Sequence, residues 1–247
     1  MANWSDPRPN AANFATTGAR TETYDAGLRA YMLSVYNYMT SGILLTGVVA
    51  MLFASTGYAE AVFLNPGILK YVIMFAPLGF VFAMSFGQGR MSFPTLQAMF
   101  WGFAIAMGLS LSTVFLQYTG TSIAGAFFAT ASGFAALSLY GYTTKRDLSA
   151  FGTFLIMGLV GLIVASVVSI FLAPEAQRMM TLIISAVGVL LFAGLTAYDT
   201  QRTKSIYAHV AGTADEGRTV IMSALSLYLD FINMFLFILR LFGSSRN

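Results

Sequence analysis

The chain has no cysteine, a single histidine and very little charge. Without thiols it can form no disulfide, no thiolate metal site and no cysteine nucleophile. The histidine, His209, lies in a polar stretch with no second metal ligand close to it in the sequence. The net charge of +3 comes from scattered basic residues, which does not favour nucleic-acid binding. Phosphate-binding glycine loops, nucleophile elbows and metalloprotease motifs are also missing, so we expect neither an enzyme nor a bound cofactor.

Apolar residues dominate what is present. They make up 57% of the chain, whereas charged residues make up only 9%, against about 25% in soluble domains. An apolar run of roughly 20 residues can span a bilayer as a helix, which satisfies its own backbone hydrogen bonds in lipid. The chain contains seven such runs, at approximately 31–56, 68–86, 96–117, 120–142, 149–172, 179–201 and 219–242. We therefore predict an all-α integral membrane protein with seven transmembrane helices.

Polar segments flank the predicted transmembrane domain, which we place at 29–243. Residues 1–28 lack the basic start and apolar core of a secretory signal, so we interpret them as a flexible cytoplasmic N-terminal tail. Residues 244–247 form a short C-terminal tail. The polar stretch 202–218 indicates a break between the last two helices. Because so few residues separate the third and fourth runs, we expect those two helices to form a tight antiparallel hairpin.

The distribution of basic residues predicts the orientation in the membrane. Seven spans place the two termini on opposite sides, and lysine and arginine gather on the cytoplasmic side. Nine basic residues lie on the side of the N-terminus: Arg8, Arg20, Arg29, Arg90, Lys145, Arg146, Arg202, Lys204 and Arg218. Four lie on the other side: Lys70, Arg178, Arg240 and Arg246. We therefore expect the N-terminus in the cytoplasm and the C-terminus outside.

Two aspartates lie inside apolar runs and are the candidate functional residues. Asp199 is near the end of the sixth run, and Asp230 is in the middle of the seventh. A charged side chain at the bilayer centre costs roughly 2.5 kcal/mol or more, and such residues usually face the bundle interior and have a function. The alternative is structural: Asp230 hydrogen-bonds a neighbouring helix, and Asp199 reaches the cytoplasmic interface.

Polar residues at helical spacing accompany both aspartates. Side chains three and four positions apart share one face of a helix. The seventh run has such a stripe, consisting of Ser223, Ser226, Asp230 and Asn233, and the sixth has Thr196, Asp199, Arg202 and Thr203. On antiparallel neighbours, the two stripes can bring the carboxyl groups together. Two close carboxyl groups in a low dielectric are expected to share a proton and titrate as a unit. Ionised, they are hard oxygen ligands suited to weak Ca²⁺ binding.

Several stretches resemble one known family. The sequence ALSLYLDFINMFLFILRLFG at 224–243 is similar to the C-terminal signature of the Bax inhibitor family, the membrane proteins with the transmembrane Bax-inhibitor motif. LTAYDTQ at 195–201 resembles its sixth-helix motif, TTKRDLSAFG at 143–152 its link into the fifth helix, and AMGLSLSTVF at 106–115 its third helix. The resemblance extends from about residue 25 to 243, and the predicted helix number and orientation match the bacterial, YccA-like members.

The resemblance implies both a fold and a function. The implied fold has seven helices, with the last one central and surrounded by the other six. The implied function is a pH-sensitive calcium leak across the membrane, here the bacterial inner membrane. The aspartate pair of the family falls on Asp199 and Asp230, and its latch arginine falls on Arg90. From its position alone, Arg90 can equally be a loop cation that only sets the membrane orientation.

Three functions follow as hypotheses. The first is a passive pathway for cations, mainly Ca²⁺, gated by the protonation of Asp199 and Asp230, with the opening pH left undetermined. The second is a regulatory protein that binds a membrane protease complex or another integral membrane protein, as the resemblance to bacterial relatives implies. The third is a proton-coupled cation carrier, although the chain lacks an obvious inverted repeat with broken helices. Membrane lipid and calcium ions are the expected partners in the first case.

Overall fold

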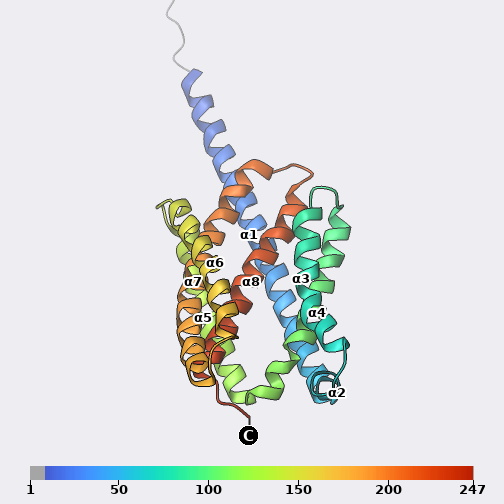
Figure 1. The fold of residues 1–247 in the computed structure, drawn as a ribbon. Helices are drawn as coiled ribbons and strands as arrows, with labels where there is room; N and C mark the ends of the chain where they lie inside the picture. The colour runs from blue at the N-terminus through green and yellow to red at the C-terminus, as the bar shows by residue number, and fades with distance from the viewer. Residues whose placement is uncertain (1–8, 247) are drawn as a thin grey trace, which may run out of the picture.

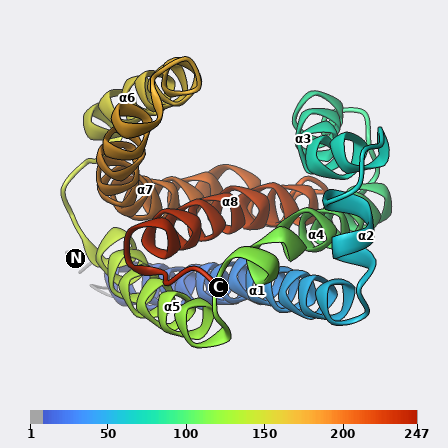
Figure 2. The same ribbon diagram turned by 60° about the horizontal axis from the view of Figure 1, so that its bottom comes forward.

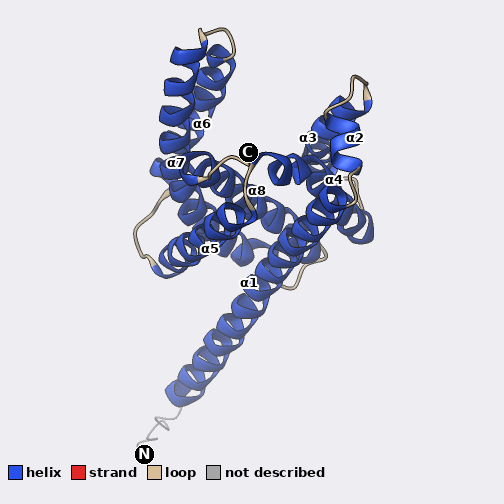
Figure 3. Ribbon diagram, turned by 90° about the horizontal axis from the view of Figure 1, so that it is seen from below, coloured by secondary structure: helices blue, strands red, loops and turns tan. Residues whose placement is uncertain are grey.

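The computed structural model describes the backbone of residues 9–246 as a bundle of helices joined by short loops (Figures 1 and 3). The helices in this part of the chain are α1 (Pro9–Ser55), α2 (Tyr58–Phe63), α3 (Leu69–Gly87), α4 (Phe93–Gln117), α5 (Gly120–Thr143), α6 (Ser149–Ser169), α7 (Pro174–Val210) and α8 (Glu216–Phe242). Seven of them, all except the short α2, are long and apolar enough to cross a membrane. The predicted all-α class and seven spans are confirmed.

Helix α8 is the centre of the bundle. In its most apolar window 67% of the residues are buried, whereas no other span exceeds 39%. It packs against α1, α4, α5 and α7. Helices α3 and α6 instead stand on the outer sides of α4 and α7 (Figure 2). The last helix is therefore central as predicted, but four helices rather than six surround it directly.

The link between α4 and α5 does not produce the tight hairpin that its length suggested. The two helices contact each other only weakly, while α4 packs mainly on α1 and α3 and α5 mainly on α7 and α8. The C-terminal segment is bound at this link. Tyr118 and Ser245 form an antiparallel bridge, and the backbone N–H of Arg246 donates to the carbonyl of Gln117 at 2.8 Å. The predicted C-terminal tail is thus tied to the bundle.

Two helices are longer than the apolar runs indicated. Helix α1 begins at Pro9 and so includes most of the segment interpreted as a tail; residues 1–8 lie outside the described residues. Helix α7 continues to Val210 through the start of the polar stretch that was predicted to be a break. Its polar residues hydrogen-bond the end of α5 and the α5–α6 link: Lys204 Nζ donates to the carbonyl of Tyr142 at 2.8 Å, and Gln201 Nε2 to that of Arg146 at 2.7 Å.

The same link places a carboxylate at the start of α6. The backbone N–H of Ser149 donates to Asp147 Oδ1 at 2.9 Å, which satisfies one free donor of the first turn. Hydrogen bonds from Ser149 lower the pKa of this exposed carboxyl group. Asp147 is therefore a structural residue at a helix start, although the position directly before the helix is Leu148.

Glycine allows the closest approach between α5 and α7. A Cβ atom on the buried Gly141 would collide with the backbone carbonyl oxygen of Ala197 on α7. Small residues at such crossings let membrane helices pack backbone to backbone. A backbone atom cannot rotate away as a side chain does, so the contact requires glycine.

We expect Gly141→Ala to lower the thermal stability of the purified protein. Overpacking a tight site costs about 1–3 kcal/mol, and about 2–4 °C of melting temperature is lost for each kcal/mol in a chain of this size. Gly133→Ala is the matched control, because a Cβ there has open space around it on the same helix. Thermal unfolding in one detergent measures both. Equal melting temperatures for the two variants would show that α5 and α7 are not in backbone contact.

Candidate site between helices six to eight

Asp199 of α7 and Asp230 of α8 meet at the interface of these two antiparallel helices. Asp230 is 4% exposed, and Asp199 is half-buried. The two carboxyl groups lie within hydrogen-bonding reach of each other. The structure therefore brings together the two residues that the sequence singled out, and it turns neither of them fully towards lipid.

The hydrogen bonds of the pair are asymmetric. Ser226 Oγ, one turn before Asp230 on α8, donates to Asp199 Oδ2 at 2.8 Å. Within the described part of the chain, Asp230 Oδ2 is the buried side-chain atom that has no hydrogen-bond donor. An unsatisfied buried acceptor is costly, and more so when it is charged. A proton held between the two carboxyl groups, or a cation beside them, would remove this cost.

A cleft of about 590 Å³ reaches the pair from the side of α6. Helix α6 packs on α7, and the cleft lies between α6 and α8. Its polar lining includes Ser226, Asp230 and Asn233 from α8, together with Asp199 and Arg202 from α7. The α6 wall is apolar except for Ser166. One side of the cleft thus supplies oxygen ligands, and the other supplies a hydrophobic surface.

The cation nearest to the pair is Arg202, not Arg90. Arg202 follows Asp199 by three residues, is exposed, and acts on the Asp199 carboxyl group through its charge. Arg90 lies in the exposed turn between α3 and α4, and among the described residues its side chain has no hydrogen bond or ion pair. The structure does not bring Arg90 to the aspartates.

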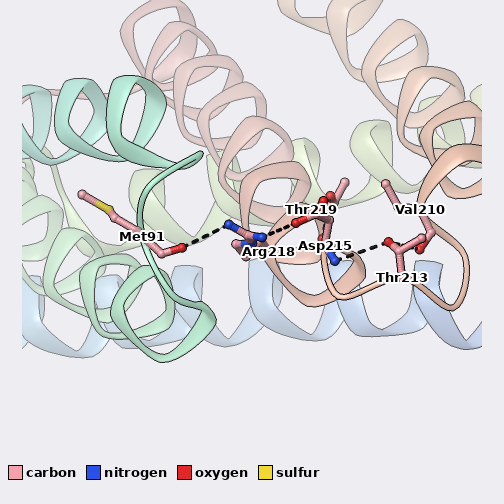
Figure 4. Close-up of polar contacts among 6 residues, drawn as sticks. All are labelled: Met91, Val210, Thr213, Asp215, Arg218 and Thr219. Carbon is pink, nitrogen blue, oxygen red and sulfur yellow. Dashed lines mark hydrogen bonds and ion pairs between the residues drawn. The ribbon is translucent and has the colours of Figure 1, made fainter.

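Contacts beside Arg90 explain where this turn is held. The next residue, Met91, accepts a hydrogen bond through its carbonyl from Arg218 Nη1 at 3.4 Å, and Arg218 also forms an ion pair with Asp215 (Figure 4). These contacts fix the α3–α4 turn at the beginning of α8. Twelve residues separate Arg218 from Asp230, or about 18 Å along a helix, so the turn that carries Arg90 is held away from the aspartate pair.

The predicted polar stripes divide between the cleft and the core. Ser223 faces away from the cleft, with its Oγ 3.4 Å from the hydroxyl of Tyr31 on α1. Thr196 is fully buried and donates to the carbonyl of Phe192 in its own helix at 2.8 Å. Ser226 and Asn233 remain as the residues that accompany the aspartates in the cleft.

One buried polar contact was missed by the sequence analysis. The hydroxyl groups of Thr46 and Tyr228 are 2.7 Å apart, and Thr46 Oγ1 donates to the carbonyl of Ala104 at 2.8 Å. These bonds join α1, α4 and α8 on the other side of α8 from the cleft. Both residues lie inside apolar runs of the sequence, but nothing in the sequence indicates that they contact each other.

The fold and the site define a class: a helical membrane protein with an acidic pair at the interface of its central helix. Comparison with known sequences gives the family. Residues 28–247 match the family described as inhibitor of apoptosis-promoting Bax1, so the chain belongs to the Bax inhibitor family.

Bacterial relatives match over nearly the whole chain. A Rickettsia prowazekii protein, RP147, is 47% identical over 94% of this chain and 97% of its own length. The Escherichia coli inner membrane protein YbhL is 43% identical over 90% of this chain and 94% of its own length. A Caulobacter vibrioides protein is 43% identical over 90% of this chain and 91% of its own length.

The contact between the two aspartates predicts a cross-link. The chain has no cysteine, so the double variant Asp199→Cys, Asp230→Cys carries two thiols and no others. We expect a short bifunctional thiol reagent to join them within one chain, as measured by intact-protein mass and by loss of free thiols. The matched control pairs Asp230→Cys with Asp147→Cys, which is exposed at the α5–α6 link. Equal cross-linking of the two double variants would contradict the geometry.

Proposed function

We propose that this protein is a pH-sensitive leak pathway for cations, mainly Ca²⁺, in the bacterial inner membrane. One observation carries the proposal: two carboxyl groups within bonding reach, one with an unsatisfied buried oxygen, beside a cleft between three transmembrane helices. The inner membrane is proposed because the relative YbhL is an inner membrane protein. The basic residues favour an N-terminus in the cytoplasm.

In this mechanism the described arrangement is the closed state. A proton shared by Asp199 and Asp230 gives the pair one negative charge and satisfies the buried oxygen of Asp230. Loss of that proton leaves two negative charges on neighbouring helices. At about 4 Å and an effective dielectric of 20, two unit charges interact by roughly 4 kcal/mol. A repulsion of this size is several times the thermal energy, so it can separate α7 from α8.

Separation of the helices gives a cation access to the oxygen atoms of the cleft. Ca²⁺ binds 6–8 oxygen ligands, of which carboxylates are the strongest. The ionised pair, the Ser226 hydroxyl and the Asn233 amide oxygen supply part of such a shell, and water completes it. Within the described residues, no three Asp, Glu, His or Cys side chains gather as a metal cage. A partial shell of this kind favours passage of the ion over permanent binding.

The proposal does not use Arg90 as a latch. The exposed Arg202 is the cation beside the pair, and its charge competes with an entering cation for Asp199. Because Arg202 is exposed, its interaction is screened by solvent and salt and does not hold the pathway closed by itself. The protonation of the aspartate pair therefore determines whether the pathway is closed or open.

We expect Asp230→Asn to abolish the pH dependence of Ca²⁺ flux while leaving the protein folded. The amide has the shape of the carboxyl group and can donate to Asp199, but it does not titrate. For wild type, flux into liposomes should rise between pH 6 and 8, by at most about tenfold per pH unit for a one-proton gate. Asp147→Asn is the matched control, because that carboxylate lies on the same side of the bundle but outside the pair.

Three outcomes would overturn the proposal. One is a pH profile of Asp230→Asn that matches wild type at equal protein insertion. Another is the absence of Ca²⁺ flux from the purified wild-type protein at every pH, which would favour the regulatory, partner-binding alternative. Uptake that saturates and follows a proton gradient would instead indicate a carrier.

A further inference from the structure

A second cleft, which we call the α1–α5 groove, lies on another side of α8. Its volume is about 650 Å³, within the 300–1,000 Å³ typical of ligand sites. Helix α1 forms one wall from Arg29 to Leu44, and α5 forms the other from Phe127 to Tyr142. Phe231, the residue after Asp230, lies at its floor. Apolar and aromatic residues dominate the lining between the ends.

The dimensions of the groove fit a lipid acyl chain. Fifteen residues separate Arg29 from Leu44, so this wall of the groove is about 22 Å long. One leaflet contributes about 15 Å to a hydrocarbon core of about 30 Å, so the groove is long enough for an acyl chain of one leaflet. The apolar side chains at the rim are open: Leu33 is 52% exposed, Leu44 57% and Leu139 64%. A chain lying in the groove would cover this surface along α1 and α5.

One end of the groove is basic. Tyr142 lines both the groove and an adjoining polar hollow of about 800 Å³. Arg29 lies in the groove itself, and the hollow adds Lys145, Arg146 and Lys204. Lys204 is held at the junction, because its Nζ donates to the carbonyl of Tyr142 and lies 4.9 Å from the centre of that ring.

Acidic residues at this end do not cancel the positive charge. Asp25 and Asp147 also line the hollow, against four basic residues in the hollow and the groove together. Asp147 already accepts a hydrogen bond from Ser149. The basic end lies on the side of the bundle where lysine and arginine gather, and basic pockets between helices on that side suit anionic head groups.

We propose that the α1–α5 groove binds an anionic phospholipid, with an acyl chain along α1 and α5 and the phosphate between Arg29 and Lys204. The combination of a long apolar channel with a cationic end matches a phospholipid better than a peptide or a free ion. The site is separate from the aspartate pair, but its occupant touches Phe231 on the same central helix. The proposal does not rest on the leak function.

Native mass spectrometry of the delipidated protein tests this proposal. The probes are phosphatidylglycerol and phosphatidylcholine with identical acyl chains, each titrated into the same detergent solution. We expect phosphatidylglycerol to bind more tightly, and Arg29→Gln and Lys204→Gln each to weaken it about fivefold, which corresponds to about 1 kcal/mol per basic residue. Arg178→Gln is the matched control, since this exposed arginine is at the opposite end of α7.

A second variant tests the apolar part without a change in charge. Ala135 lines the groove and is exposed, so Ala135→Trp should fill the channel and weaken binding of both lipids. Because Ala135 and Arg29 are both exposed, these two variants suffice if Lys204→Gln unfolds.

Four results would overturn the proposal. They are equal affinity for the two lipids, unchanged binding in Ala135→Trp, displacement of phosphatidylglycerol by millimolar inorganic phosphate, and a dimer of the chain that Ala135→Trp dissociates. The third would show that the hollow binds free phosphate, and the fourth that a second copy of the chain fills the groove.

Discussion

The contact of two carboxyl groups at the α7–α8 interface is the constraint on which the rest of the structure depends. A carboxylate facing lipid costs roughly 2.5 kcal/mol or more, so the polar face of α8 must be covered by protein. Helix α7 covers it, and Ser226 supplies a hydrogen bond to Asp199. The other faces of α8 contact α1, α4 and α5. The most buried helix of the bundle is therefore also the one that carries a buried acid.

The outer helices determine how this acid can be reached. Because α6 rests on α7 and not on α8, a cleft extends sideways to Asp199 and Asp230. On another side, α1 and α5 form the walls of the apolar groove above Phe231. The central helix thus separates the cleft beside the acidic pair from the apolar groove, and consecutive residues, Asp230 and Phe231, line one each.

The sequence predicted most of what depends on local chemistry. Apolar runs of sufficient length predicted the seven spans, because a segment that crosses the lipid must satisfy its own backbone hydrogen bonds, and a helix does so. Helical spacing around Asp199 and Asp230 predicted a shared interface, and the structure places them together. A proton shared by the two carboxyl groups, and a role for the pair in ion flux, remain proposals.

Features that depend on tertiary contacts were beyond sequence reasoning. The polar stretch from Arg202 to Val210 has the composition of a loop, but it is helical. Gln201 and Lys204 hydrogen-bond the α5–α6 link and the end of α5, and these contacts could not be predicted from the sequence. The short linker between α4 and α5 makes the chain reverse its direction, but it does not determine which helices pack against each other. Likewise, the motif match at Arg90 gave its position in the chain, while its exposure follows from the turn held by Arg218.

A double-mutant cycle on the pH dependence of Ca²⁺ flux tests the central claim most directly. Asp199→Asn, Asp230→Asn and the double variant are reconstituted at equal density and assayed from pH 6 to 8 with wild type. If the two carboxyl groups titrate as one unit, each single variant removes the pH dependence and the double variant adds nothing further. Two single variants that each keep a pH-dependent flux, with effects that add in the double variant, would show that the carboxyl groups act independently and would contradict the account.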